Sequence, residues 1–284
     1  MIRLGSGDWS ATVAPDLGGA LLDLNHGERP IFRPTPPGAR QILETACFPL
    51  LPFANRIADA RFHFGGEDVV LPTLPQFAPH ALHGDGWLRP WTPVRQDDAS
   101  LTLTLDGGGD HWPWLWSATQ TIALSAAGLR IDLSLTNRDS RPAPAGLGLH
   151  PYFHRRPGAR LQLPTTQVWL TGADEIPERL APASALVDWS AAVALADAPS
   201  VDHAYAMRHA GAVLEDKAGV VEMTASEKCR WAQIYAPPGV DFVCVEPVTH
   251  RPDAIHAPPG EDSGLTVLSP GESLSIWMTV GVRA

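Results

Sequence analysis

The chain has 284 residues and a formal net charge of -10, and its 21 Lys and Arg are scattered along the sequence. This balance argues against a nucleic-acid partner and favours a small neutral or weakly charged ligand. The 28 Pro and 25 Gly are also widely distributed. Because that pattern is typical of many turns between short strands, we expect an all-β protein.

The three cysteines stand far apart, at Cys47, Cys229 and Cys244. Their spacing predicts neither a disulfide framework nor a thiolate metal site. The N-terminal residues lack the apolar stretch of a signal peptide, and no apolar run approaches the length of a membrane span. We therefore expect a cytoplasmic protein with no membrane partner, present as a monomer or a homodimer.

The first third of the chain predicts short strands and irregular loops. Apolar pieces at 11–14 and 20–24 are separated by Gly-containing turns, and three prolines make 33–38 a loop. Residues 47–54 are apolar but interrupted by two prolines, and they lead into the polar pair Asn55-Arg56. This order predicts a buried sheet edge that ends at a rim.

The middle of the chain shows the clearest strand pattern. Leucine or isoleucine alternates with polar residues over 101–105 and again over 129–136, which predicts antiparallel strands with one buried face. We interpret the aromatic run 110–116 between them as strand packing, with a sugar platform as the alternative.

The last third contains the one candidate insertion, an Ala- and Pro-rich segment at 176–199. Its Ala-rich portion 189–196 predicts a short helix. Strand patterns resume at 201 and continue to the end of the chain. We find no domain boundary and no internal repeat, so we expect a single domain over residues 1–284.

A histidine stands inside the mostly apolar run 146–154, directly before Pro151. The residue before a proline favours extended geometry, so His150 should end a strand at the rim of a sheet. Tyr152 and Phe153 add flat apolar faces that suit either a sugar or the core. A lone histidine in such a place is more often structural than catalytic.

Glu246 repeats this layout, because it ends the apolar run 242–245 and also stands before a proline. Partial burial at the end of such a strand should raise the pKa of the carboxyl group toward that of a useful general base. Two ionisable groups in matching positions indicate an acid–base pair.

These stretches resemble the aldose 1-epimerase (galactose mutarotase) family. The resemblance extends over almost the whole chain. It rests on four blocks in order, which are Asn55-Arg56-Ile57 with Phe62 and Gly65-Gly66; Leu82-His83-Gly84; His150-Pro151-Tyr152-Phe153; and Glu246-Pro247 with Pro252-Asp253-Ala254. A weaker fifth block is Val201-Asp202-His203. Each short string is a weak signal, and their joint order and spacing carry the assignment.

The resemblance implies a large antiparallel β-sandwich with an open concave sugar cleft, without a metal or another cofactor. It implies a small sugar as partner, with Glu246 as base and His150 as acid in the interconversion of the α and β anomers of a free aldose. Substrate binding falls to Arg56, His83 and Asp202 by the same resemblance. For this chemistry we expect the pKa of Glu246 to be raised and that of His150 to stay near its ordinary value.

Three residues depart from the common family pattern, namely Asp85, His154 and His256. These departures leave the preferred sugar open. We expect Trp87 and Arg89 to shape the pocket.

Four alternatives remain open from the sequence. One is a metal site formed by His80, His83, His150, His154 and Glu246. A second is a glycosidase with Asp202 and Glu246 as paired carboxylates. The third is an epimerase of a phosphorylated or sulfonated sugar, whose anion Arg56, Arg61 and Arg89 would bind. The last is a carbohydrate-binding module without catalysis.

Overall fold

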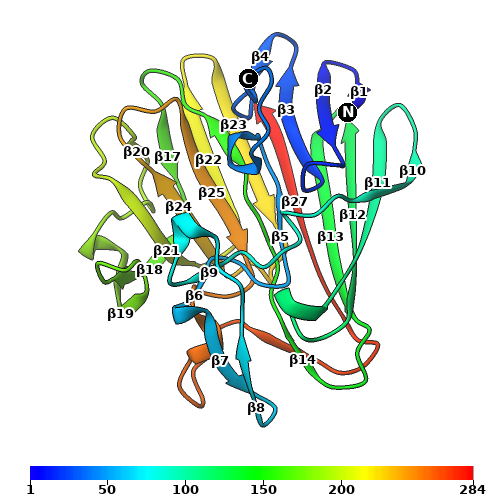
Figure 1. The fold of residues 1–284 in the computed structure, drawn as a ribbon. Coiled ribbons are helices and arrows are strands. Elements are labelled where there is room, and N and C mark those ends of the chain that lie inside the picture. Colours follow the sequence, from blue (N-terminus) through cyan, green and yellow to red (C-terminus); the bar gives the residue numbers. More distant parts are fainter. Residues whose placement is uncertain (284) are drawn as a thin grey trace.

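The computed structural model describes residues 1–283, and its regular elements are β-strands with a few short 3-10 helices (Figure 1). The strand pairs described in this range are antiparallel. Two large sheets carry most of the strands. The expected all-β antiparallel architecture is therefore confirmed.

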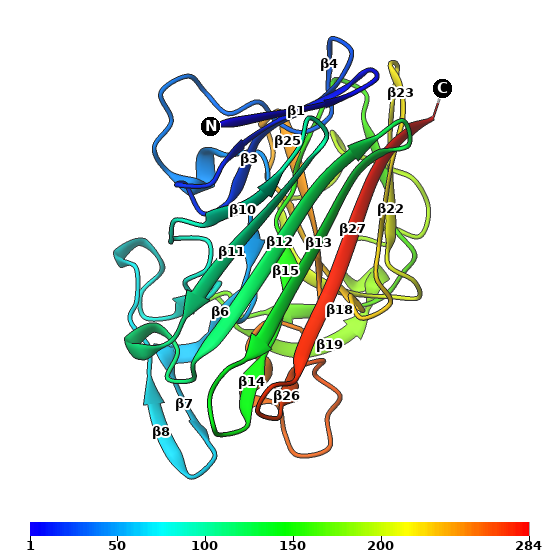
Figure 2. The same cartoon turned by 90° about the vertical axis from the view of Figure 1, so that its right-hand side faces the viewer.

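The larger sheet has nine strands with mostly regular register. The alternation predicted at 129–136 appears in its central strands, where Ile131 and Leu133 point into the core and Arg130 and Asp132 lie on the other face. Figure 2 shows its long strands side by side. In spatial order they are β10 (Thr92–Gln96), β11 (Ser100–Gly107), β12 (Trp116–Ser125), β13 (Gly128–Asn137), β27 (Ser273–Arg283), β23 (Gly219–Ala225), β22 (Gly211–Asp216), β17 (Arg160–Gln162) and β20 (Val193–Ala194).

The second sheet has eight strands and is less regular, because prolines and bulges interrupt several of them. In order they are β19 (Pro177–Pro182), β18 (Thr165–Thr171), β21 (Val201–Met207), β24 (Trp231–Ala236), β25 (Phe242–Val248), β15 (Gly148–Leu149) and β5 (Pro49–Leu50), with β16 (Tyr152–His154) also paired to β25.

Smaller elements surround the two sheets. The N-terminal residues form a four-stranded sheet, β1 (Ile2–Ser6), β2 (Trp9–Ala14), β3 (Ala20–His26) and β4 (Arg29–Pro30). Short pairs join β14 (Ala143–Ala145) to β26 (Thr266–Leu268), β6 (Arg56–Ile57) to β9 (Ala81–Leu82), and β7 (Arg61–Phe64) to β8 (Glu67–Val70). The 3-10 helices span Ile42–Glu44, Ala58–Ala60, Pro75–Phe77, Gly109–His111, Ala183–Ala185 and Ala254–His256. In Figure 1 the β7–β8 hairpin projects from the lower edge.

The two large sheets share one hydrophobic cluster. Ile131 and Leu133 from the nine-stranded sheet belong to it together with Val243 and Val245 from β25. Since successive residues of a strand face opposite sides, the residues that alternate with these valines face away from the core. The far face of the eight-stranded sheet is therefore free to carry a site.

Two predictions about particular segments had different outcomes. The aromatic run is confirmed as packing, because Trp112, Trp114 and Trp116 are all buried. The predicted helix at 189–196 is wrong: Trp189 is buried in the core, and Val193–Ala194 forms strand β20, which pairs with β17. Tertiary contacts of Trp189 and pairing with β17 outweigh the weak helix propensity of alanine.

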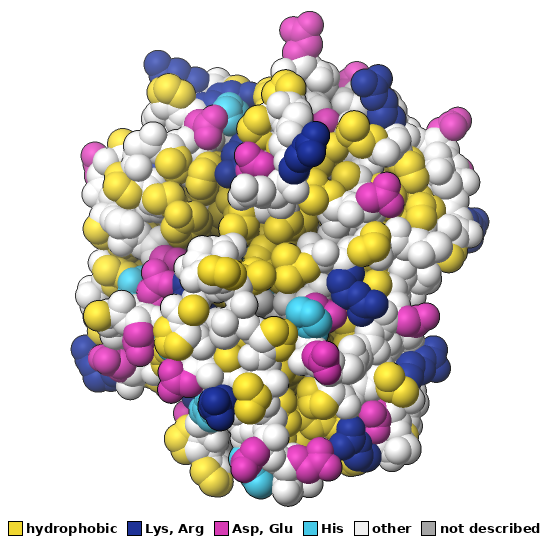
Figure 3. Space-filling model, viewed as in Figure 1, with side chains coloured by type: hydrophobic (Ala, Val, Ile, Leu, Met, Phe, Trp, Pro, Cys, Tyr) yellow, Lys and Arg dark blue, Asp and Glu magenta, His cyan; other side chains and the backbone are white. Residues whose placement is uncertain are grey.

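The three cysteines are buried and free, as their spacing predicted. Among residues 1–283, no helix combines the length and apolar character that a membrane crossing requires. On the face seen in Figure 3, basic side chains are interspersed with acidic ones. The scattered charge of the sequence thus remains scattered on this surface.

Candidate active site

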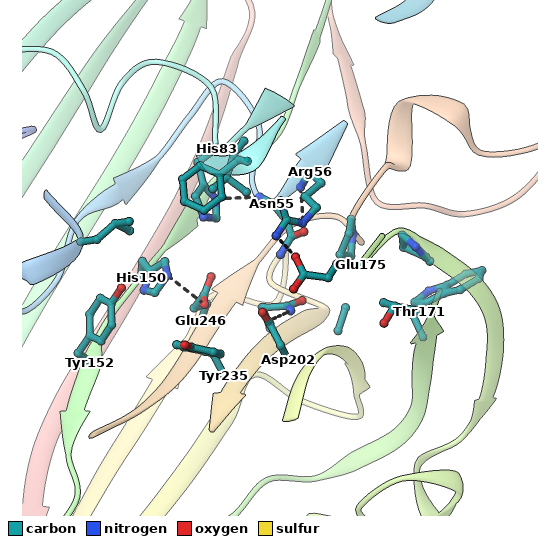
Figure 4. Close-up of a pocket in the computed structure, with 18 of the residues that line it drawn as sticks. Asn55, Arg56, His83, His150, Tyr152, Thr171, Glu175, Asp202, Tyr235 and Glu246 are labelled. Carbon is teal, nitrogen blue, oxygen red and sulfur yellow. Dashed lines mark hydrogen bonds and ion pairs between the residues drawn. The ribbon is translucent and has the colours of Figure 1, made fainter. Parts of the chain in front are cut away.

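A cleft of about 400 Å³ lies on the outer face of the eight-stranded sheet (Figure 4). The five predicted site residues all line it, which brings together positions that are up to about 190 residues apart in the sequence. The lining comprises Arg33, Leu43, Asn55, Arg56, Phe77, Leu82, His83, His150, Tyr152, Trp169, Thr171, Glu175, Pro177, Asp202, Ala204, Gln233, Tyr235, Phe242, Glu246 and Pro252.

Strand alternation builds the floor of the cleft. Val243 and Val245 enter the core, so Phe242 and Glu246 of the same strand face the cleft. On the adjacent strand Gln233 is paired with Glu246, and on the next strand Asp202 is paired with Tyr235. Three neighbouring strands thus place polar groups on one surface.

His150 lies just beyond strand β15, whose two residues are Gly148 and Leu149. Its amide donates to the carbonyl of Phe48 at 2.9 Å, which fixes the backbone beside β5. Its imidazole stacks on the ring of Tyr152, with centroids 4.7 Å apart and planes inclined by 18°. The prediction of a strand-end histidine before Pro151 is confirmed, and Tyr152 holds the ring in place.

His150 and Glu246 face each other at the floor of the cleft. The distance from Nε2 of His150 to Oε1 of Glu246 is 3.3 Å, and both side chains are less than a tenth exposed. The remaining oxygen of Glu246, Oε2, and Nδ1 of His150 are buried without a hydrogen-bond partner. Both atoms therefore keep unused hydrogen-bonding capacity.

Burial disfavours both charges of this pair. It raises the pKa of Glu246 well above its usual value, and the negative charge of Asp202 raises it further. It lowers the pKa of His150 to about 3. The expected rise for Glu246 agrees with the structure, whereas the expectation of an ordinary pKa for His150 was wrong, because the imidazole is desolvated and Arg33 is nearby.

His83 forms the wall opposite the floor and is held in one tautomer. Its Nδ1 accepts a hydrogen bond from the amide of Asn55 at 2.9 Å, and its own amide donates to the carbonyl of Asn55 at 2.9 Å. An accepting Nδ1 leaves the proton on Nε2, which can then donate. Desolvation lowers the pKa of His83 well below its usual value, so the ring is a neutral donor at neutral pH.

Arg56 lies at the other end of the cleft from Tyr152 (Figure 4). Its Nη2 pairs with Oε2 of Glu175, which sits between β18 and β19 in a left-handed conformation with φ 64°. The carbonyl of Arg56 accepts from the amide of Asp253, whose side chain accepts from the amide of Ala58 at 2.9 Å. The Pro252-Asp253 block therefore positions the strand that presents Arg56.

Asp202 is linked to the floor through Gln233. The amide nitrogen Nε2 of Gln233 donates to Oδ1 of Asp202 at 2.6 Å, while its oxygen Oε1 is buried without a partner. Desolvation raises the pKa of Asp202. Gln233 thus bridges the space between Asp202 and Glu246, and its free oxygen adds an acceptor to the site.

Sequence reasoning missed several residues of the cleft, among them Arg33, Glu175, Gln233 and Tyr235. Period-2 alternation along 231–235 was a usable signal for Gln233 and Tyr235, since Ala232 and Ile234 between them are apolar and buried. Arg33 and Glu175 lie outside regular strands, and no local pattern marks them.

Several residues that the sequence linked to the pocket lie outside its lining. Asp85 is buried and pairs with Arg89 at 3.4 Å, and His256 pairs with Asp253 at 2.7 Å. Trp87 does not reach the cleft but supports it, because its ring packs edge-on against His83. Trp87 therefore shapes the pocket from behind His83, as expected, whereas Arg89 pairs with Asp85 outside the lining.

The predicted metal set is not assembled, because His80 and His154 lie outside the cleft lining. Among residues 1–283, the group of metal-ligand type that does meet is His150, Cys244 and Glu246. Burial raises the pKa of Cys244 well above its usual value, so the thiol is protonated at neutral pH when no ion is bound. Of the predicted anion-binding set only Arg56 lines the cleft.

The candidate insertion at 176–199 reaches the cleft only at its start. Pro177 lines the cleft next to Glu175, whereas Trp189 is buried in the core and Val193 pairs in the nine-stranded sheet. The β18–β19 turn therefore forms one wall of the cleft.

Comparison with known proteins assigns the family. The family model for aldose 1-epimerase matches residues 1–281. An uncharacterised Escherichia coli K12 protein, YphB, is 32% identical over 94% of this chain and 94% of its own length. The E. coli aldose 1-epimerase is 33% identical, over 36% of this chain and 30% of its own.

Solved structures agree on the fold. An E. coli K12 structure provisionally described as an aldose 1-epimerase aligns with a TM-score of 0.90 at 28% identity, covering 99% of this chain and 98% of its own. A galactose mutarotase-like protein from Clostridium acetobutylicum gives 0.87 at 20% identity, covering 99% and 94%. The family model and the shared fold together support a protein of the sugar-epimerase class. The chain belongs to the aldose 1-epimerase family.

Proposed function

We propose that the chain is an aldose 1-epimerase that interconverts the α and β anomers of a free aldose by opening and closing the sugar ring. The observation that carries this proposal is the pair formed by Glu246 and His150, buried 3.3 Å apart at the floor of a polar cleft. A base and an acid at hydrogen-bond range of one reacting centre are what the reaction needs.

The pair carries one exchangeable proton in the proposed reaction. Glu246, as carboxylate, removes the proton of the C1 hydroxyl while His150, as imidazolium, donates its proton from Nε2 to the ring oxygen. The C1–O bond to the ring oxygen breaks, and an open-chain aldehyde forms beside a neutral glutamic acid and a neutral imidazole. Rotation about C1–C2 and the reverse transfers close the ring with the opposite anomeric configuration.

The pKa directions fit a proton shared in this way. Burial favours the neutral form of the pair, because it raises the pKa of Glu246 and lowers that of His150. In the free protein the proton therefore rests on Glu246, and the ion-pair form that opens the ring arises when this proton moves across the 3.3 Å to Nε2 of His150. Both forms carry no net charge, and the step from one to the other only moves the proton.

The other cleft residues bind and orient the sugar in this proposal. His83 donates from Nε2 to an oxygen near the anomeric centre, since its Nδ1 already accepts from Asn55. Arg56 donates to hydroxyls remote from C1, and Asp202 accepts from them. Holding the ring in one orientation lowers the entropy cost of the proton transfers.

The test is polarimetry on anomerically pure aldoses, including glucose and galactose, with and without the protein. The wild-type protein should speed the approach to anomeric equilibrium, and His150→Asn should lose that effect. A matched control is His154→Asn, because His154 lies outside the cleft lining. Equal loss in both variants, or none in either, would refute the assignment.

Two alternative functions would give different assay results with the same protein samples. A glycosidase would hydrolyse aryl glycosides and lose that turnover when Asp202 or Glu246 is changed to its amide. A non-catalytic module would bind sugars while leaving the anomeric exchange rate unchanged.

A further inference from the structure

Arg33 is a cation of the cleft to which the proposed reaction gives no role. It follows Phe32, which forms an isolated antiparallel bridge with Phe153, and its amide donates to the carbonyl of Tyr152 at 2.7 Å. Its side chain is half-buried and lines the cleft. The arginine is thus attached by its backbone to the segment that carries His150.

The guanidinium of Arg33 is fixed in one position. Its carbon lies 3.7 Å from the ring centre of Tyr152 and 4.6 Å from that of Phe242. Nη2 donates to the carbonyls of Leu43 and Thr45, both at 2.7 Å. Two aromatic faces and two carbonyls hold the group rigid, so its remaining donors are preorganised for a ligand.

Those remaining donors have no partner within the chain. Nη1 makes no hydrogen bond to residues 1–283, and no carboxylate of that range lies within ion-pair distance of the guanidinium. Nε is buried and unpartnered. A half-buried guanidinium without a counter-ion is costly, and a bound anion removes that cost.

The two ends of the cleft differ in charge. At the Arg56 end the guanidinium pairs with Glu175, and Asp202 and Asp174 act on its charge as well. A sugar anion placed there would meet carboxylates, whereas neutral hydroxyls would not be repelled. At the Arg33 end the guanidinium contacts Tyr152, Phe242 and the carbonyl of Leu43, and the carboxyl group of the proposed reaction, Glu246, is paired with His150 and not with Arg33.

We propose that Arg33 binds an anionic group on the substrate, so that this enzyme prefers an acidic aldose. The inference rests on the proposed function, which places the ring oxygen at His150. The ring oxygen is bonded to C1 and C5, and Arg33 lies on the ring of Tyr152, the same ring that stacks on His150. The substituent on C5 therefore points to Arg33, and a carboxylate or phosphate at C6 meets its free donors.

The experiment compares kcat/KM for anomeric exchange of glucose with that of glucuronate and of glucose 6-phosphate, all measured by exchange NMR on one sample. Wild type should have a higher kcat/KM for at least one anionic sugar than for glucose. A preference for glucuronate would identify a carboxylate as the anion, and a preference for glucose 6-phosphate would identify a phosphate. Arg33→Gln should lower the anionic-to-neutral ratio about 10- to 100-fold, as expected for hydrogen bonds to a charged group. Arg33→Lys, which keeps the charge without the planar fork, should lower it less.

The ratio is independent of the folded fraction, so a partly unfolded variant still reports on the proposal. The matched control is Arg61→Gln, since Arg61 is exposed and outside the cleft lining; its ratio should equal that of wild type. Exchange of glucose with no preference for either anion, and a ratio that Arg33→Gln leaves unchanged, would overturn this inference alone. Acceleration of none of the three sugars would overturn the proposed function as well.

Discussion

The two large sheets are both antiparallel, but they have different roles. In the nine-stranded sheet β11, β12, β13 and β27 pair residue for residue without a register shift. In the eight-stranded sheet β15 and β5 have two residues each, prolines interrupt the edge, and β18 has shifts on both sides. The regular sheet supplies core, and the interrupted sheet supplies the cleft.

This difference shows why the site is where it is. A strand that stops before a proline leaves its last side chain at the rim, free to turn toward a ligand. His150 is placed in this way, at the end of β15. The prediction that Glu246 also ends its strand was wrong, because β25 continues through Pro247 to Val248 and pairs there with β24; alternation along β25 turns the Glu246 side chain to the cleft. The comparison predicts that substitutions on the cleft face of the eight-stranded sheet lower activity, whereas substitutions in the core of the nine-stranded sheet lower stability.

The largest expected effect is on catalysis, from Glu246→Gln. Loss of the base should lower kcat for anomeric exchange by about 10²- to 10⁴-fold, the range typical of general acid–base residues. Stability should not fall, because the change removes a buried carboxyl group whose ionised form is disfavoured. The rate is measured by polarimetry and the stability by urea unfolding.

Its control lies in the other sheet. Glu222 of β23 pairs with Arg283 at 3.0 Å on the surface, so Glu222→Gln should leave both rate and stability near wild type. A wild-type rate in Glu246→Gln would contradict the role of that residue.

The next effect is on stability, from Leu133→Ala in β13. Leu133 is 1% exposed, and truncation of a buried leucine typically costs about 2–5 kcal/mol of the free energy of unfolding. The exchange rate per folded molecule should be unchanged, because the cavity forms in the regular sheet. Urea unfolding together with an active-fraction measurement checks both statements, and a large drop in the rate would show that the two sheets are coupled.

A smaller effect is expected on substrate binding, from Arg56→Ala. Lost hydrogen bonds from a charged donor to sugar hydroxyls should raise KM about tenfold, with kcat reduced less. Glu175→Gln should change KM in a milder way, because Glu175 is half exposed and acts through Arg56. Initial rates over a range of sugar concentrations separate KM from kcat. A tenfold fall in kcat with no change in KM would instead show that Arg56 takes part in the catalytic step.

The smallest effect is expected from acidification. Lowering the pH from 7.5 to 5.5 should leave kcat/KM nearly constant. The active pair holds one proton, which is lost as the pH rises through the raised pKa of Glu246, and a second is gained only near the lowered pKa of His150, about 3. A fall centred near pH 6.5, the ordinary histidine value, would contradict this. The measurement is kcat/KM across the pH range with a substrate that does not titrate there.

Much of the fold and the central residues of the cleft were predictable from the sequence. Alternation identified the strands at 101–105 and 129–136, and the two residues before prolines identified His150 and Glu246. These signals are local, since strand period and proline geometry act within a few residues. The five predicted site residues are therefore the ones that short motifs mark.

The rest depended on contacts that no local pattern encodes. Arg33 became a cleft residue through Tyr152, more than a hundred residues away, and Glu175 through its pair with Arg56. The segment at 189–196 was misjudged because burial of Trp189 outweighs alanine propensity. The pKa of His150 was misjudged because desolvation depends on the packed structure.

The most direct test of the central claim is a double-mutant comparison by exchange NMR, with wild type, Glu246→Gln, His150→Asn and the double variant. If the two residues pass one proton between them, each single change removes most of the acceleration, and the double change removes little more. It would contradict the account if the loss of rate in the double variant equalled the product of the two single losses, or if either single variant kept the wild-type rate.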